Sequence, residues 1–198
     1  MRKVIAVLMS MAFVFSYAGV CNALEINDSN VFSLIEYCEN NEISSEEQLD
    51  EIIYQYTGFY GTTDIQKNDQ DSVVSFELTI DYENQYVITT TVYESNSNRS
   101  TKSGHADKVY HNDLGYEVFT VRVDGSFQHN GSTCSTTSAT ATFTPALLSS
   151  WSSSPSASSG KSGNKAYAKA SGTATNGFAS QYYYVYLYCD INGKLTSA

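Results

Sequence analysis

Two hydrophobic patterns divide the chain, and the first of them is helical. In residues 24–60, apolar side chains recur every three or four positions, which predicts helices with one buried face. We expect a short helix through 31–38, and a longer one that begins at a capping box of Ser44 and Glu47 and ends at Gly58. This segment also carries many carboxylates, so the sequence predicts a small acidic helical region.

The second pattern is the alternation of apolar and polar residues, which runs through residues 61–198. Such alternation is typical of antiparallel strands that bury one face and expose the other. The predicted strands cover residues 74–80, 86–92, 119–127, 133–143, 166–175 and 181–189. Polar loops are expected over 94–104 and over the serine-rich stretch 149–163. The predicted fold is therefore mainly β, an antiparallel β-sandwich with a small N-terminal helical region.

The strands are expected to form one β-rich domain over residues 61–198. An alternative boundary lies at 95–104. In that alternative, residues 24–95 form an α+β unit and residues 104–198 form the sandwich.

The last long strand, 181–189, has two contrasting faces. Tyr183 lies on one face with Val185, Leu187 and Cys189, and these four side chains are predicted to be core. The other face consists of tyrosines alone: Tyr182, Tyr184, Tyr186 and Tyr188. This stripe either packs beneath the helical region or a second sheet, or forms an open aromatic surface that stacks on sugars or peptides.

The first residues of the chain have the pattern of a secretory signal peptide. Arg2 and Lys3 precede the apolar run 4–20, and small residues lead to a predicted cleavage site after Ala23. An uncleaved anchor is less well supported, because polar residues interrupt the run. A lipoprotein is also disfavoured, because the residue before Cys21 is not small. The sequence therefore predicts a secreted protein, extracellular or associated with the cell surface, with no stable membrane insertion after cleavage.

Composition narrows the range of partners. Removing residues 1–23 leaves 175 residues with a net charge of −12, since that segment holds two basic residues and no acid. Such a charge keeps a protein soluble and repels nucleic acid and anionic lipid head groups, so neither is expected as a partner. A protein or a glycan outside the cell remains as the expected partner.

Three cysteines remain after cleavage: Cys38, Cys134 and Cys189. We favour a disulfide between Cys134 and Cys189, because both lie at the ends of predicted strands in the β-rich region. Cys38 lies in a predicted helix, where it fits a small buried apolar residue. No cysteine and histidine spacing indicates zinc.

No motif specifies a chemical reaction. His105, Asp107, His111 and Asp113 fall close together and have side chains that bind metals, but we expect them to be solvated residues of a loop. Residues 190–193 are explained by a hairpin turn better than by a calcium loop. Neither a nucleophile elbow nor a phosphate-binding loop occurs, so no catalytic residue, metal or cofactor is predicted.

The C-terminal half resembles a group of small exported proteins from Gram-positive, often gut-dwelling, bacteria. The resemblance rests on residues 115–127, on Asn130-Gly131-Ser132 with Cys134, and on Leu187-Tyr188-Cys189-Asp190 and the turn that follows. It covers about residues 104–196. It implies a β-sandwich closed by the Cys134–Cys189 disulfide, and it supplies no function and no catalytic residue.

These observations favour a non-enzymatic extracellular interaction module that binds a protein or a glycan. The tyrosine stripe is its expected binding surface, together with Trp151, the only tryptophan, in the serine-rich loop. Two alternatives are a secreted hydrolase whose active site no motif marks, and a secreted inhibitor or antagonist that presents the Trp151 loop.

Overall fold

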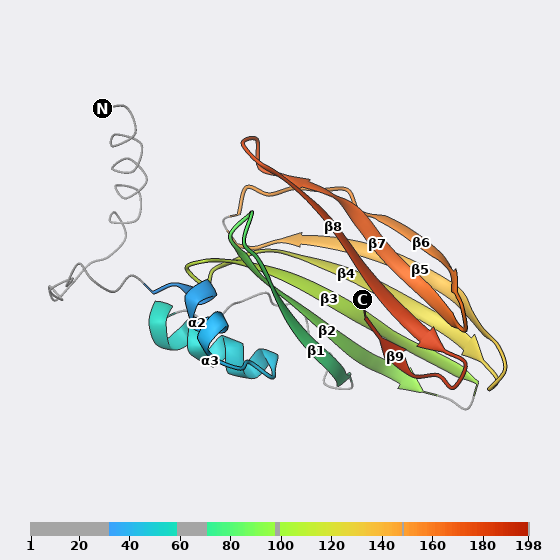
Figure 1. Ribbon diagram of the computed structural model, residues 1–198. Coiled ribbons are helices and arrows are strands. Elements are labelled where there is room, and N and C mark those ends of the chain that lie inside the picture. Colours follow the sequence, from blue (N-terminus) through green and yellow to red (C-terminus); the bar gives the residue numbers. More distant parts are fainter. Residues whose placement is uncertain (1–31, 59–70, 98–99, 148, 198) are drawn as a thin grey trace, which may run out of the picture. The chain divides into compact units, whose positions relative to one another are not determined.

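Two antiparallel sheets build the protein, as the computed structural model shows (Figure 1). It describes residues 32–58, 71–97, 100–147 and 149–197, so the predicted signal peptide lies outside the described residues. Sheet A contains, in hydrogen-bonded order, β1 (Ser72–Asp81), β2 (Tyr86–Ser97), β3 (Thr101–Asn112), β4 (Glu117–His129) and β5 (Cys134–Pro145). Sheet B contains β6 (Ser156–Ser162), β7 (Lys165–Thr175), β8 (Ser180–Asp190) and the short β9 (Leu195–Thr196). The predicted mainly β fold is confirmed.

The sandwich core lies between the inner faces of the two sheets. Phe119, Val121 and Val123 of β4 are fully buried against Val185 and Leu187 of β8. The inner face of β7 consists of alanines, whose small side chains leave room for the aromatic rings of sheet A. These inward positions are the apolar positions of the alternating pattern, so the sequence predicts this core well.

Two helices, α2 (Leu34–Asn40) and α3 (Glu46–Thr57), pack on the opposite, outer face of sheet A. Leu34, Leu49 and Ile53 form a second apolar cluster with Val87 of β2. Asp113, in the turn between β3 and β4, fastens α2, because its Oδ1 accepts hydrogen bonds from Ser33 Oγ (2.7 Å) and from the amide of Ile35 (3.0 Å). The helices therefore cover part of the outer face of sheet A, whereas the outward residues of β5 are largely exposed.

The start of α3 differs by one residue from the prediction. Ser45, not Ser44, is the N-cap, and its hydroxyl accepts from the amide of Gln48 at 3.2 Å. Gln48 Oε1 in turn accepts from the amide and hydroxyl of Ser44. The capping box of Ser44 and Glu47 was wrong because the next register, Ser45 with Gln48, fits the same pattern. Gly58 ends the helix in a left-handed conformation (φ 72°), as expected.

Two segments predicted as loops are largely strand. Residues 94–104 include the end of β2 and the start of β3, where Lys102 and Glu94 form an ion pair at 2.7 Å across the two strands. Within the serine-rich stretch, Ser156–Ser162 form strand β6, paired with β7. Both predictions were wrong for the same reason. Ladder hydrogen bonds use the backbone, so a polar strand at an edge or a rim needs no apolar side chain.

Candidate functional site: the open tyrosine face

The tyrosine stripe of β8 lies on the outer face of sheet B. Tyr182 is 59% exposed and Tyr184 is 44% exposed, while Tyr186 and Tyr188 are half-buried. Tyr183, between them in sequence, is 1% exposed, because it points into the core. Of the two arrangements left open by the sequence, the described residues therefore show the open one. We call Tyr167, Tyr182, Tyr184, Tyr186 and Tyr188, with Lys165 and Lys169, the tyrosine face.

The rings of β8 pack on one another instead of lying flat. Successive ring centroids along the stripe are 6.2, 6.0 and 5.3 Å apart, and the rings of Tyr186 and Tyr188 are stacked at 14°. Tyr184 meets Tyr186 edge-on at 69°, and Tyr182 is tilted by 48° from Tyr184. Side chains two residues apart on a strand stand side by side, so these rings contact one another. Because their planes differ, the stripe is not a coplanar platform.

Tyr167 of β7 is the ring that lies across the sheet. A Cβ atom on Gly160, its partner in β6, would come within 2.5 Å of the Tyr167 hydroxyl and 2.7 Å of Cζ. Only glycine therefore lets the ring rest directly on the backbone of β6. Tyr167 then meets Tyr186 and Tyr188 edge-on, at 5.5 and 6.0 Å.

Lysines occupy the faces of the upright rings. Lys169 Nζ lies 5.1 Å from the centroid of Tyr186 and 5.9 Å from that of Tyr184, and Lys165 Nζ lies 5.7 Å from that of Tyr188. A hydrogen bond with the Tyr186 hydroxyl raises the pKa of Lys169, so this ammonium group stays charged. Because aromatic faces carry partial negative charge, these ammonium groups are attracted to the tyrosine rings.

A third lysine reaches this surface from the other sheet. Lys108 of β3 places its Nζ 5.0 Å from the Tyr184 ring centroid and 3.3 Å from the Tyr184 carbonyl oxygen, to which it donates. Burial lowers the pKa of Lys108, and Glu77 opposes that shift. The Tyr184 ring is therefore held between two ammonium groups, which orders it at the edge of sheet B.

Acidic and basic residues are unevenly distributed along the chain. Only one of the 21 acidic residues, Asp190, follows Asp124, whereas four of the eleven basic residues do. Asp190 of β8 lies opposite Lys165 in the register of β7 and β8. Sheet B is therefore a basic surface on an acidic protein, although the whole chain has a net charge of −10.

The sequence analysis missed Tyr167, Lys165 and Lys169 as members of this surface. The signal is present in the segment Lys165-Ala166-Tyr167-Ala168-Lys169, whose alternation places the alanines in the core and the other three side chains outside. What the sequence does not show is that Gly160 lies beneath Tyr167, because this contact depends on the register of β6 against β7.

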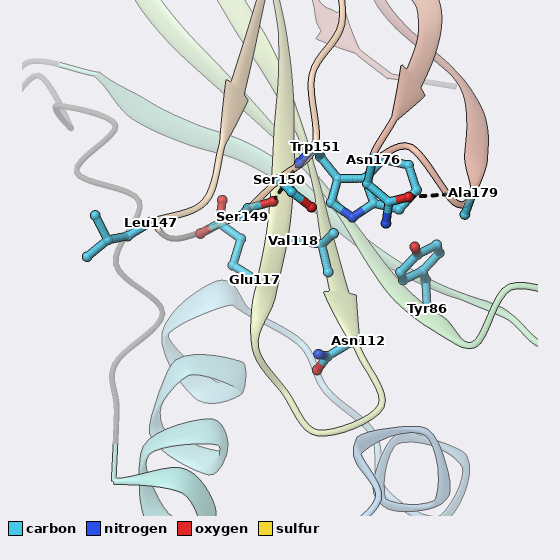
Figure 2. Close-up of a pocket in the computed structure, with 10 residues that line it drawn as sticks. All are labelled: Tyr86, Asn112, Glu117, Val118, Leu147, Ser149, Ser150, Trp151, Asn176 and Ala179. Atoms are coloured by element: carbon cyan, nitrogen blue, oxygen red, sulfur yellow. Dashed lines mark hydrogen bonds between the residues drawn. The ribbon is translucent and has the colours of Figure 1, made fainter. Parts of the chain in front are cut away.

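Trp151, the other predicted binding residue, is mostly buried. It is 9% exposed, and its ring packs 5.4 Å from that of Phe119. One edge of the indole lines an open pocket of about 470 Å³ at the end of the sandwich (Figure 2). Most of the Trp151 ring is thus structural, with only that edge left for a ligand.

The cluster His105, Asp107, His111 and Asp113 is not a solvated loop, so that prediction was wrong. The first three are buried in strand β3 on the outer face of sheet A, beneath the helical layer. Asp107 receives two hydrogen bonds of 2.7 Å from Arg122, and the His105 ring stacks on Tyr93 at 4.6 Å. In the described parts of the chain, no three His, Cys, Asp or Glu residues are placed to hold a metal ion. The prediction failed because paired polar side chains fit a buried strand as well as a loop.

Cys134 and Cys189 are buried free thiols in this structure, and no disulfide is formed. Both belong to the sandwich core, one on β5 and one on β8, so each sheet supplies one sulfur. Burial, together with a hydrogen bond to the neighbouring Cys134, raises the pKa of Cys189. Cys38 is half-buried on α2, and burial raises its pKa to about 11.

No protein-family profile, curated protein or solved structure matches this chain. Neither of the helices in the described residues is long and apolar enough to cross a membrane.

Proposed function

We propose that this protein is an exported, non-enzymatic interaction module that binds an acidic glycan through the tyrosine face. The observation that carries the proposal is an open row of tyrosines interleaved with lysines on a basic surface of an acidic protein. Exposed aromatic residues in this number are costly to leave in water unless they serve recognition.

The polar groups of the tyrosine face favour an anionic ligand. Lys108, Lys165 and Lys169 place their ammonium groups 5.0 to 5.9 Å from the ring centroids of the tyrosine stripe. Ammonium groups and phenol hydroxyls both donate hydrogen bonds, so they complement a carboxylate or sulfate group.

The density of charge favours a glycan over a nucleic acid. Double-stranded DNA carries about one charge per 1.7 Å, and binding it requires many closely spaced cations. The tyrosine face holds Lys165 and Lys169, with Lys108 at its edge, dispersed among uncharged phenols. Beyond about 8 Å, at physiological salt, the acidic remainder of the protein is screened. A linear polymer with sparse acidic groups and many hydroxyls fits this surface.

Export and the disulfide belong to the same proposal. A protein that binds a surface glycan works outside the cytoplasm, where thiols oxidise. Cys134 and Cys189 would then join the two sheets and fix sheet B over the core, which keeps the tyrosine face in place.

The test measures affinity for dextran sulfate of low sulfate content, with unmodified dextran as a matched neutral polymer. We expect saturable binding to dextran sulfate that weakens as sodium chloride is raised, and little binding to dextran. The double variant Lys165→Gln/Lys169→Gln should bind dextran sulfate about tenfold more weakly, since each exposed ion pair is worth up to about 1 kcal/mol.

Lys161→Gln is the matched control for the single variants Lys165→Gln and Lys169→Gln, because each of the three removes one charge from sheet B. Lys161 pairs with Ala166, whose side chain is on the core side, so it lies on the opposite face from Tyr167. Equal weakening by Lys161→Gln would show that only net charge matters and would contradict the proposed surface. Equal binding of both polymers would contradict an acidic ligand.

A further inference from the structure

The helical layer carries a second cluster of aromatic rings that is open to solvent. Phe32 and Tyr56 stack face to face, with their ring centroids 4.1 Å apart and their planes 8° from parallel. Tyr37 meets Tyr56 edge-on at 6.0 Å and lies 6.3 Å from Phe32. Although two rings contact it, Tyr56 is 55% exposed. We call Phe32, Tyr37 and Tyr56 the helical aromatic patch, and an exposed patch of this kind is typical of an interaction site.

The charge around the helical aromatic patch is negative. Residues 32–58 contain seven acidic residues and no lysine, arginine or histidine. Glu36 and Glu39 of α2 lie on either side of Tyr37 in the sequence, and both are exposed. The patch is therefore an aromatic surface beside carboxylates, whereas the tyrosine face is an aromatic surface interleaved with lysines.

The two aromatic surfaces lie on opposite sides of the sandwich. The helices pack on the outer face of sheet A through Leu34 and Leu49, and the tyrosine face is the outer face of sheet B (Figure 1). Both sheets lie between the two surfaces, so the surfaces of one molecule cannot meet. A contact between them requires two copies of the chain.

Charge determines which surfaces of two copies can pair. Two tyrosine faces would bring Lys165 and Lys169 of both copies together, and two helical layers would oppose their carboxylates. Like charges placed opposite each other in an interface disfavour binding. The helical aromatic patch against the tyrosine face is the combination with opposite charges, and it also brings aromatic rings of both copies into contact.

We propose that the helical aromatic patch of one copy docks on the tyrosine face of a second copy. Glu36 and Glu39 then meet Lys165 and Lys169, while the ring of Tyr56 packs among the tyrosines. Such an interface is heterologous, and two copies cannot close on each other because the surfaces lie on opposite sides. Copies therefore add head to tail beyond the dimer. This docking uses the tyrosine face of the proposed function, and it needs no glycan.

Sedimentation equilibrium of the exported protein, without any glycan, tests the docking. At about 0.15 M sodium chloride the average mass should rise with protein concentration beyond the mass of two chains. It should fall at about 1 M, where charges are screened within about 3 Å. Both Lys165→Gln/Lys169→Gln and Tyr56→Lys should sediment as single chains. Lysine is tolerated at position 56, because a cation in the last turn of α3 suits the helix dipole.

A mixture of these two variants tests the head-to-tail arrangement. Lys165→Gln/Lys169→Gln keeps an intact helical aromatic patch, and Tyr56→Lys keeps an intact tyrosine face. One copy of each should therefore form a pair that cannot grow, so the average mass should reach that of two chains and stop there. An interface between two identical surfaces would give no such recovery.

Val73→Lys is the matched control for Tyr56→Lys. Val73 is 52% exposed and the charge change is the same, but it lies toward the other end of α3. It pairs with Tyr93, whose hydroxyl donates to Glu46 at the start of that helix. Val73→Lys should associate as the original chain does. Equal losses from Val73→Lys and Tyr56→Lys would show that only net charge matters, and would overturn the inference.

Three further results would overturn the docking. They are an exported protein that stays a single chain at all concentrations, an average mass that stops at two chains, and a mixture of variants that stays single. Tyr56→Lys should still bind dextran sulfate. A protein that binds dextran sulfate without self-association would overturn this inference alone, and self-association without dextran sulfate binding would overturn the acidic-glycan proposal alone.

Discussion

The outer faces of the two sheets invert the usual distribution of side chains. On sheet A, the middle of the outer face is buried, yet it carries Thr89, His105, Asp107 and Thr120. On sheet B, the outer face is open, yet it carries a row of tyrosines. A buried polar group and an exposed aromatic patch are the two observations that call for an explanation in any fold. On sheet A, the buried polar side chains are explained by hydrogen bonds to one another. On sheet B, packing does not explain the exposed tyrosines, so we assign that face to binding.

The largest expected effect concerns the proposed disulfide between Cys134 and Cys189, which are free thiols in this structure. If Cys134 and Cys189 are joined in the exported protein, the closed loop of the unfolded chain gives a stabilisation of about 4 kcal/mol by the chain-entropy model. Mass spectrometry of the exported protein should show the loss of two hydrogens, and urea unfolding should show the destabilisation in Cys134→Ser. Cys38→Ser is the control and should change neither quantity. An intact free thiol at Cys189 in the exported protein would contradict the link.

The second-largest expected effect tests whether hydrogen bonds between buried side chains stabilise the covered face of sheet A. Arg122→Met leaves the Asp107 carboxylate buried without its two hydrogen bonds, and we expect a loss of about 3 kcal/mol in the free energy of unfolding. Adding Asp107→Leu should restore much of it, since both charges are then gone. Asp124→Asn on the same face is the comparison, because Asp124 accepts only a long hydrogen bond, of 3.3 Å, from Thr140. A loss from Arg122→Met as small as that from Asp124→Asn would refute this account of sheet A.

Acid should weaken the covered face through His111. Complete burial lowers the pKa of His111 to about 4, below its ordinary value of 6.5. The unfolded chain therefore binds a proton in the window between these values and the folded chain does not, so stability falls as the pH falls below 6.5. At about 1.4 kcal/mol per pKa unit, the loss from pH 7 to pH 5 is about 2 kcal/mol. In His111→Leu, the free energies of unfolding from denaturation curves at pH 7 and pH 5 should differ by less than in the original chain. An equally large difference would mean that other groups cause the acid sensitivity.

The smallest expected effect on stability lies on the open face. Tyr186→Ser removes a half-buried ring and should cost less than about 1 kcal/mol, while weakening the binding of dextran sulfate. Tyr183→Ser, three residues earlier on the same strand, removes a core ring and the hydrogen-bond partner of Ser153 Oγ at 2.6 Å. It should therefore destabilise the protein far more. Thermal unfolding of the two variants compares the faces directly, and similar losses would mean that the tyrosine face is structural.

The sequence predicts the core of the fold better than its two outer faces. Alternation identifies Phe119, Val121 and Val185 as core, because burial between two sheets requires apolar residues at every second position. It fails at His105 and Asp107, because their burial depends on Arg122 and on helix α3, which meet β3 only in the folded chain. The tyrosine stripe is visible in the sequence, but its exposure is not, since the same alternation fits a strand covered by a helix.

The most direct test of the central claim is NMR mapping of the exported protein during titration with dextran sulfate. We predict that the largest shift changes fall on the outward residues of β7 and β8, from Lys165 to Lys169 and from Tyr182 to Tyr188. The resonances of Tyr93 and His105 on the covered face should stay in place. Changes concentrated on α2, α3 or the outer face of sheet A, with β8 unaffected, would contradict the assignment of the open face to binding.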